Sequence, residues 1–83
     1  MGSEQEVTFR LRTTRPIRIY LEPWGNEFDC PADTTLQIVG RGPKGDTLEL
    51  EVGDDAVTVY GWPGSIVSVL RDGVPLAEQP AGQ

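Results

Sequence analysis

Glycine and proline interrupt this chain so often that little room is left for a helix. Of its 83 residues, 10 are glycine and 7 are proline. Beyond Pro16, the longest segments without either residue, 32–39 and 65–72, are each 8 residues long. An average α-helix has about 11 residues, and a proline inside a helix removes a hydrogen bond and clashes with the preceding turn. The sequence therefore predicts an all-β protein with no substantial helix.

Apolar and polar residues alternate in residues 7–12, 17–22 and 48–52, a pattern typical of strands with one buried and one solvated face. The Asp72-Gly73 pair is the strongest hairpin signal, because both central positions of a type I′ turn take a positive φ. Connections this short favour antiparallel neighbours. We therefore expect a single small antiparallel β-sandwich or barrel of six to seven short strands. The further strands are expected at residues 35–39, 56–60, 66–71 and 74–76.

The same patterns divide the chain into three parts. Residues 1–6 are expected to form a flexible N-terminus, residues 7–76 the β domain and residues 77–83 a disordered tail. Within the domain, residues 25–33 are expected to form an irregular extended arm, in which Phe28 and Cys30 share a parity and reach toward the core. The Gly-Pro-Lys-Gly sequence at residues 42–45 fits a type I turn.

Cysteine and histidine usage limits the chemistry of the chain. There is one cysteine, Cys30, and no histidine, so an intrachain disulfide is excluded and the usual ligands of a metal site are missing. We therefore expect no cofactor and no metal. The acidic N-terminus does not resemble a signal peptide, and no apolar stretch is close to the length of a membrane span, which is about 18 residues. These features predict a cytoplasmic protein with no membrane partner. The hydrophobic strand followed by Glu-Pro-Trp-Gly at residues 22–25 resembles short bacterial proteins, and this resemblance implies no catalytic residue.

Charge is distributed unevenly along the chain, whose net charge is −6. Residues 1–18 carry a net charge of +2, and residues 19–83 carry −8. An acidic surface repels phosphates, so the composition disfavours a nucleic-acid partner. Arg10, Arg12 and Arg18 fall on the outward faces of the first two predicted strands, where a hairpin would gather them into a cationic patch. Such a patch suits an acidic partner or cross-strand pairing with Glu49 and Glu51.

The aromatic residues form a pseudo-repeat about forty residues apart, Tyr-Leu-Glu-Pro-Trp-Gly at 20–25 and Tyr-Gly-Trp-Pro-Gly at 60–64. In each copy a strand ends in an outward tyrosine, Tyr20 or Tyr60, and a turn with proline and glycine follows that carries Trp24 or Trp62. Rigid aromatic rings outside the core suit a partner contact or a platform for stacking sugars. The alternative is that the tryptophans cover the ends of the sandwich or barrel.

These observations favour a binding protein over an enzyme. Glu49 and Glu51 lie two residues apart on one strand face, as paired catalytic carboxylates can, but alternation produces such pairs in most strands. We expect a non-enzymatic protein–protein interaction or assembly module, with a homo-oligomer as one form of it. A carbohydrate-binding module and an acidic inhibitor or decoy of a nucleic-acid-binding protein are the alternatives. The candidate binding residues are Tyr20, Trp24, Tyr60, Trp62, Arg10, Arg12 and Arg18.

Overall fold

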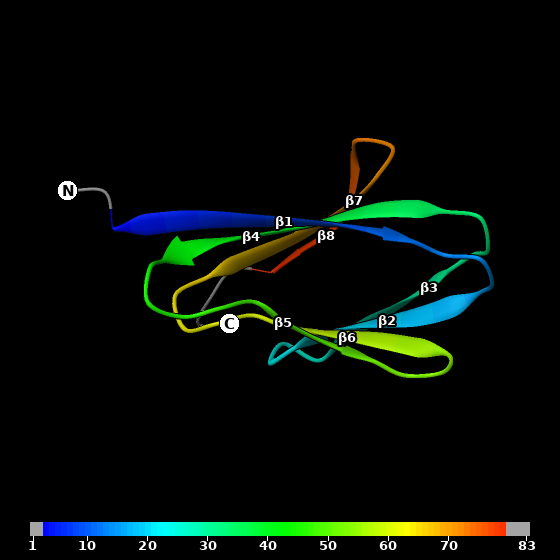
Figure 1. The fold of residues 1–83 in the computed structure, drawn as a ribbon, viewed down its shortest axis with the longest axis horizontal. Coiled ribbons are helices and arrows are strands. Elements are labelled where there is room, and N and C mark those ends of the chain that lie inside the picture. The colour runs from blue at the N-terminus through cyan, green and yellow to red at the C-terminus, as the bar shows by residue number, and fades with distance from the viewer. Residues whose placement is uncertain (1–2, 80–83) are drawn as a thin grey trace.

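The computed structural model describes residues 3–79, and within them two four-stranded β-sheets face each other (Figure 1). The first sheet has the strand order β1-β4-β7-β8 and the second β3-β2-β6-β5. The predicted all-β class is confirmed, and of the two expected forms, sandwich or barrel, the structure is a sandwich, with eight strands in place of six or seven. The strands are β1 (Glu4–Arg12), β2 (Ile17–Glu22), β3 (Asn26–Cys30), β4 (Thr35–Pro43), β5 (Glu49–Val52), β6 (Ala56–Tyr60), β7 (Ile66–Arg71) and β8 (Val74–Gln79).

Alternate side chains of both sheets form the core between the two layers. Strands β2, β4, β6 and β7 occupy the central positions of their sheets, and their inward side chains are the most deeply buried. Partly buried side chains of the edge strands pack around them. Burial of these apolar groups is the main stabilising contribution that a domain without disulfides can make. The buried apolar residues are Ile19, Leu21, Cys30, Leu36, Ile38, Leu48, Val57, Val59, Trp62, Val67 and Val69.

One strand pairing differs from the prediction that all neighbours are antiparallel. Strands β2 and β6 lie side by side and parallel, with Arg18 opposite Ala56 and Glu22 opposite Tyr60. Several short connections do not form hairpins but carry the chain from one sheet to the other, as between β1 and β2 and between β4 and β5. Strand β2 is reached by a crossing from β1 in the first sheet, and β6 is reached by a hairpin from the edge strand β5, so no hairpin joins β2 to β6 and the two strands run in the same direction. The carboxyl ends of both strands therefore meet at one end of the second sheet.

Several element boundaries also differ from the sequence-based expectations. Strand β1 begins at Glu4, within the segment expected to be flexible, and β8 continues to Gln79. Residues 1–2 and 80–83 lie outside the described residues. Strand β4 extends through the glycines to Pro43, so the predicted type I turn at 42–45 is wrong, since its first residues pair with β1. The expected arm contains β3, which pairs with β2 along its whole length.

Two local predictions are confirmed. Asp72 and Gly73 join β7 to β8 with φ values of 53° and 79°, the left-handed conformation that the hairpin requires. Cys30 is buried in the core and Phe28 packs against it, as their shared parity indicated. Within the residues described, no helix is long and apolar enough to cross a membrane.

Candidate functional site

The outer face of the second sheet gathers carboxylates from three of its four strands. Each sits at an outward position, because its neighbours in the strand point toward the core. Five side chains on this face are acidic and one is basic, so its net charge is −4. We call this surface the acidic face. It consists of Arg18, Tyr20, Glu22, Glu27, Asp29, Glu49, Glu51, Ala56, Thr58 and Tyr60.

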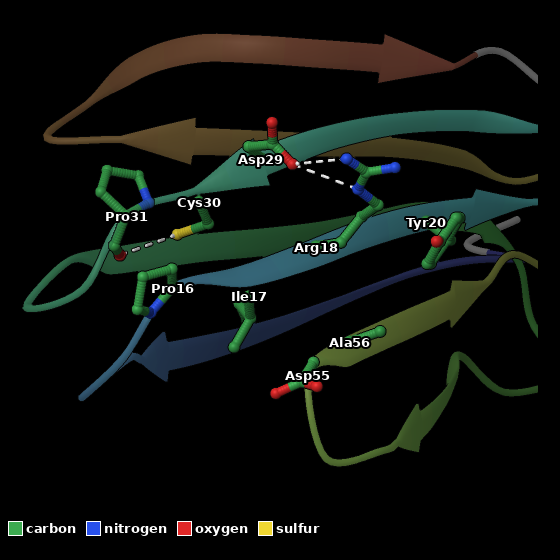
Figure 2. Close-up of a pocket in the computed structure, with 9 residues that line it drawn as sticks. All are labelled: Pro16, Ile17, Arg18, Tyr20, Asp29, Cys30, Pro31, Asp55 and Ala56. Carbon is green, nitrogen blue, oxygen red and sulfur yellow. Dashed lines mark hydrogen bonds and ion pairs between the residues drawn. The ribbon is translucent and has the colours of Figure 1, made fainter.

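The basic residue of the acidic face, Arg18, is held by two carboxylates of the neighbouring strand β3. Its guanidinium nitrogens lie 2.9 Å from Glu27 Oε1 and 3.1 Å from Asp29 Oδ1 (Figure 2 shows the Asp29 contacts). The hydrogen bond to Asp29 is the main cause that raises the pKa of Arg18, with further contributions from the charges of Asp29 and Glu27. A guanidinium engaged in this way offers few donors to an acidic ligand.

At the other end of the face, Tyr60 stands between two strands that carry glutamates. In the sheet register it lies opposite Glu22 of β2 and Glu49 of β5. Its hydroxyl donates a hydrogen bond to Glu51 Oε1 at 2.9 Å. That bond is the main cause that raises the pKa of Tyr60, and burial and the nearby carboxylate charges act in the same direction. The phenol ring is thereby fixed beside three carboxylates.

A first hollow lies where β2, β3 and β6 begin or end at one edge of the acidic face (Figure 2). It has a volume of about 710 Å³ and is open to solvent. The Sγ atom of Cys30 at its edge is buried and donates to the carbonyl of Pro31 at 3.7 Å. Asp55, on the opposite side, pairs with Arg15 at 3.8 Å. The lining residues are Pro16, Ile17, Arg18, Tyr20, Asp29, Cys30, Pro31, Asp55 and Ala56.

A second hollow lies beyond the opposite end of β2, where the parallel pairing brings the two aromatic turns together. The backbone N–H of Gly61 donates to the carbonyl of Glu22 at 2.9 Å, and the ring of Trp24 lies against Gly61. The hollow has a volume of about 310 Å³. We call it the aromatic hollow. It is lined by Pro23, Trp24, Tyr60, Gly61, Trp62, Pro63 and Gly64.

The two tryptophans of the pseudo-repeat have different environments. Trp62 is only 4% exposed, and its indole N–H donates to the carbonyl of Pro43 at 2.8 Å. It closes one end of the core, with its six-membered ring against Gly40 of β4. This agrees with the interpretation that a tryptophan covers the end of the sandwich. Trp24 is half-buried and packs against the core from the turn after β2.

The predicted arginine patch does not form. Arg10 and Arg12 belong to β1 in the first sheet, whereas Arg18 belongs to β2 in the second. Strand β1 pairs with β4, so Arg10 lies opposite Gln37 and Arg12 opposite Thr35. The expected hairpin between the first two strands is wrong because residues 13–16 cross from one sheet to the other. The predicted pairing of the arginines with Glu49 and Glu51 is wrong for the same reason.

The carboxylates of β3 were missed at the sequence level. Glu27 and Asp29 alternate with Phe28 and Cys30, which is the pattern of a half-buried strand. The prolines and glycines on either side are typical of irregular segments, which is why the sequence predicts an arm here. Parity at these four positions was the signal that marked Glu27 and Asp29 as outward-facing.

Neither a metal site nor a relative accounts for these side chains. Among residues 3–79, no three histidine, cysteine, aspartate or glutamate side chains are grouped so that they could hold a metal ion. Comparisons with protein-family models, with curated proteins and with solved structures find no match to this chain. Function must therefore be inferred from the surface itself.

Proposed function

We propose that this protein is a non-enzymatic protein-binding module whose acidic face binds a basic segment of a partner protein. The observation that carries the proposal is the collection of five carboxylates on one sheet face, where the single arginine is already paired with two of them. The negative charge of such a face attracts a basic partner and repels phosphate backbones. An acidic inhibitor or decoy of a nucleic-acid-binding protein is one form of this function, because such proteins present basic surfaces.

The shape of the face supports a protein partner of extended or flat form. The face spans the outer side of one sheet, and the two hollows lie at opposite ends of β2. A basic peptide lying along the strands would reach the carboxylates of β2, β3 and β5. Its aliphatic side-chain stems would contact Tyr20 and Tyr60.

The proposal is tested by measuring the binding of a labelled basic peptide at low and high salt. We expect binding that weakens as salt increases, and no binding of an acidic peptide of equal length. A Glu22→Gln/Glu49→Gln double variant should weaken binding severalfold. The matched control is Glu4→Gln/Glu6→Gln, which removes the same charge from β1 in the other sheet. Absence of binding at low salt, or equal weakening by both double variants, would show that the acidic face is not the binding surface.

Self-association through strand β8 is a second candidate function. This strand is an edge of the first sheet, and its apolar residues Val74 and Leu76 are 60% and 47% exposed. Unpaired edges that carry exposed apolar side chains favour pairing with a second chain. The acidic face of each copy would stay open in such a dimer. Light scattering after size-exclusion chromatography tests this, and a monomer of 9.1 kDa at high concentration would exclude it.

A carbohydrate-binding function has less support, because Trp62 is buried and cannot offer a ring face to a sugar. Trp24 and Tyr60 alone would have to provide the stacking surface in the aromatic hollow. Tryptophan fluorescence measured during titration with a panel of saccharides separates this function from the proposed one. A saturable change with one sugar would favour carbohydrate binding.

A further inference from the structure

The aromatic hollow combines ring surfaces with an unusual lack of other side chains. Gly61 and Gly64 add no side chains of their own to the hollow, and neither position has room for a Cβ atom. At Gly61 that atom would collide with Trp24, and at Gly64 it would approach Pro43 Cγ to 2.9 Å. Gly64 also has a φ of +84°, which favours glycine. The hollow is therefore built on two positions where only glycine fits.

Hydrogen bonds from both turns hold the walls of the hollow in place. The backbone N–H of Trp62 donates to Ser65 Oγ at 3.0 Å, and the N–H of Ser65 returns a bond to the Trp62 carbonyl at 2.9 Å. In the other turn, the N–H of Gly25 donates to the carbonyl of Leu21 at 2.9 Å. Walls that are ordered before binding lose little entropy when a ligand enters.

The charges around the hollow select among the ligands that its rings would accept. Tyr60, which lines the hollow, lies between Glu22 and Glu49 and donates a hydrogen bond to Glu51. Carboxylates therefore lie beside this aromatic ring. A neutral proline-rich or sugar ligand would stack on the rings but would gain nothing from these charges. A cation gains from both, because aromatic faces attract positive charge and carboxylates pair with it. Among protein cations, the planar guanidinium stacks on rings and bonds to carboxylates through two parallel donors, which an ammonium group cannot do.

We infer that the aromatic hollow is the specificity pocket of the module and takes an arginine side chain of the basic partner. The guanidinium stacks on the exposed parts of Trp24 and Tyr60 and pairs with Glu22 or Glu49. This inference rests on the proposed function, since the acidic face brings the basic segment to the hollow. Long-range charge attracts lysine and arginine about equally to the acidic face, and stacking on the rings of the hollow adds the preference for arginine.

The experiment compares two labelled peptides that differ only in having arginine or lysine as their basic residues. We expect the arginine peptide to bind about tenfold more tightly, which corresponds to one ring-and-carboxylate pairing. Trp24→Leu should remove this preference and leave the lysine peptide almost unaffected. The comparison variant is Tyr20→Leu, which removes an aromatic ring from the acidic face outside the hollow; it should weaken both peptides alike and keep the ratio of their affinities.

A second measurement does not depend on whether the Trp24 variant folds. In the unaltered protein, the arginine peptide should shift the NMR signal of the Trp24 indole N–H, while that of the buried Trp62 moves less. Equal affinities for the two peptides, a preference that survives Trp24→Leu, or an unmoved Trp24 signal would overturn the inference and leave the proposed function intact. Failure of both peptides to bind would overturn both.

Discussion

The ring of Trp24 lies against Gly61 and fills the space that a Cβ atom at residue 61 would need. This contact joins the turn after β2 to the turn after β6, and it exists because the two strands are parallel neighbours. It fixes the position of a ring that lines the aromatic hollow. Any side chain at residue 61 must displace this ring or move the backbone of one turn.

Gly61→Ala is therefore expected to reduce both stability and the preference for arginine. Forcing a methyl group into a packed contact costs about 1–3 kcal/mol in the free energy of unfolding. Urea unfolding followed by tryptophan fluorescence measures this cost, and the peptide pair described above measures the preference. The control is Gly53→Ala, where the added atom would meet only the carbonyl of Ala56 at an ordinary distance of 3.5 Å. Equal stability of the two variants would contradict the contact between Trp24 and Gly61.

A buried hydroxyl, that of Thr13, connects the crossing at residues 13–16 to the crossing at residues 31–34. Thr13 Oγ1 donates to the carbonyl of Pro31 at 2.8 Å and accepts the backbone N–H of Thr34 at 3.1 Å. Thr13→Val keeps the shape of the side chain but leaves the buried N–H of Thr34 without the hydroxyl that accepts its hydrogen bond. We expect a loss of about 1–3 kcal/mol in the free energy of unfolding. The exposed neighbour provides the control, since Thr14→Val should change stability little, and a harmless Thr13→Val would show that the hydroxyl is dispensable.

The pKa of Tyr60 gives a prediction at alkaline pH. The hydrogen bond to Glu51 raises this pKa above the ordinary value of 10.0, so the folded protein retains the phenol proton more firmly than the unfolded chain does. The resulting stabilisation is fully present below pH 10 and is lost as pH rises through the folded pKa. The difference in unfolding free energy between the unaltered protein and Tyr60→Phe should therefore shrink over that range.

Glu51→Gln provides the matched test of the cause. It removes the charge and weakens the hydrogen bond, so the phenol should ionise at a lower pH than in the unaltered protein. Ultraviolet absorbance during alkaline titration follows this ionisation, and subtraction of the Tyr60→Phe curve isolates the Tyr60 contribution. An ionisation that stays in place or moves to higher pH in Glu51→Gln would rule out this hydrogen bond as the cause.

Local sequence patterns were sufficient to predict the strands and most of their faces, but not the sheets. The alternation around Ile19 and Val57 shows which side chains point inward, because parity is a property of a single strand. Which strands become neighbours depends on whether a short connection reverses in its own sheet or crosses to the other. The crossings at residues 13–16 and 31–34 are about as short as the true hairpin turns. Length alone therefore cannot distinguish a crossing from a hairpin. The parallel pairing of β2 with β6 follows from long-range packing of the core.

The candidate site depends on that pairing more than on any motif. The sequence indicated that Tyr20 and Tyr60 face outward, and it marked the two aromatic turns as similar. It did not indicate that the turns touch, because contact between Trp24 and Gly61 requires the carboxyl ends of β2 and β6 to meet. The acidic face was missed for the same reason, since Glu27 and Glu51 become parts of one surface only when β3 and β5 flank that pair.

Removal of the arginine from the acidic face should strengthen binding of basic peptides. Arg18 occupies Glu27 and Asp29, and a partner cation must compete with it for both carboxylates. Arg18→Gln frees these groups and makes the face more negative by one charge. Solvent-exposed ion pairs contribute little to folding stability, so the variant should stay folded. We expect the basic peptides to bind severalfold more tightly at low salt, and the gain should fall as salt increases.

The charge change itself must be separated from its position. Arg10→Gln changes the net charge by the same amount, but it lies on the outer face of β1 in the first sheet. If the acidic face is the binding surface, Arg18→Gln should increase affinity clearly more than Arg10→Gln does. Isothermal titration calorimetry with one peptide and all three proteins makes the comparison directly. Weaker binding by Arg18→Gln would instead mean that Arg18 itself contacts the partner, as the sequence-based interpretation held, and the partner would then have to supply an acceptor that displaces Glu27 or Asp29.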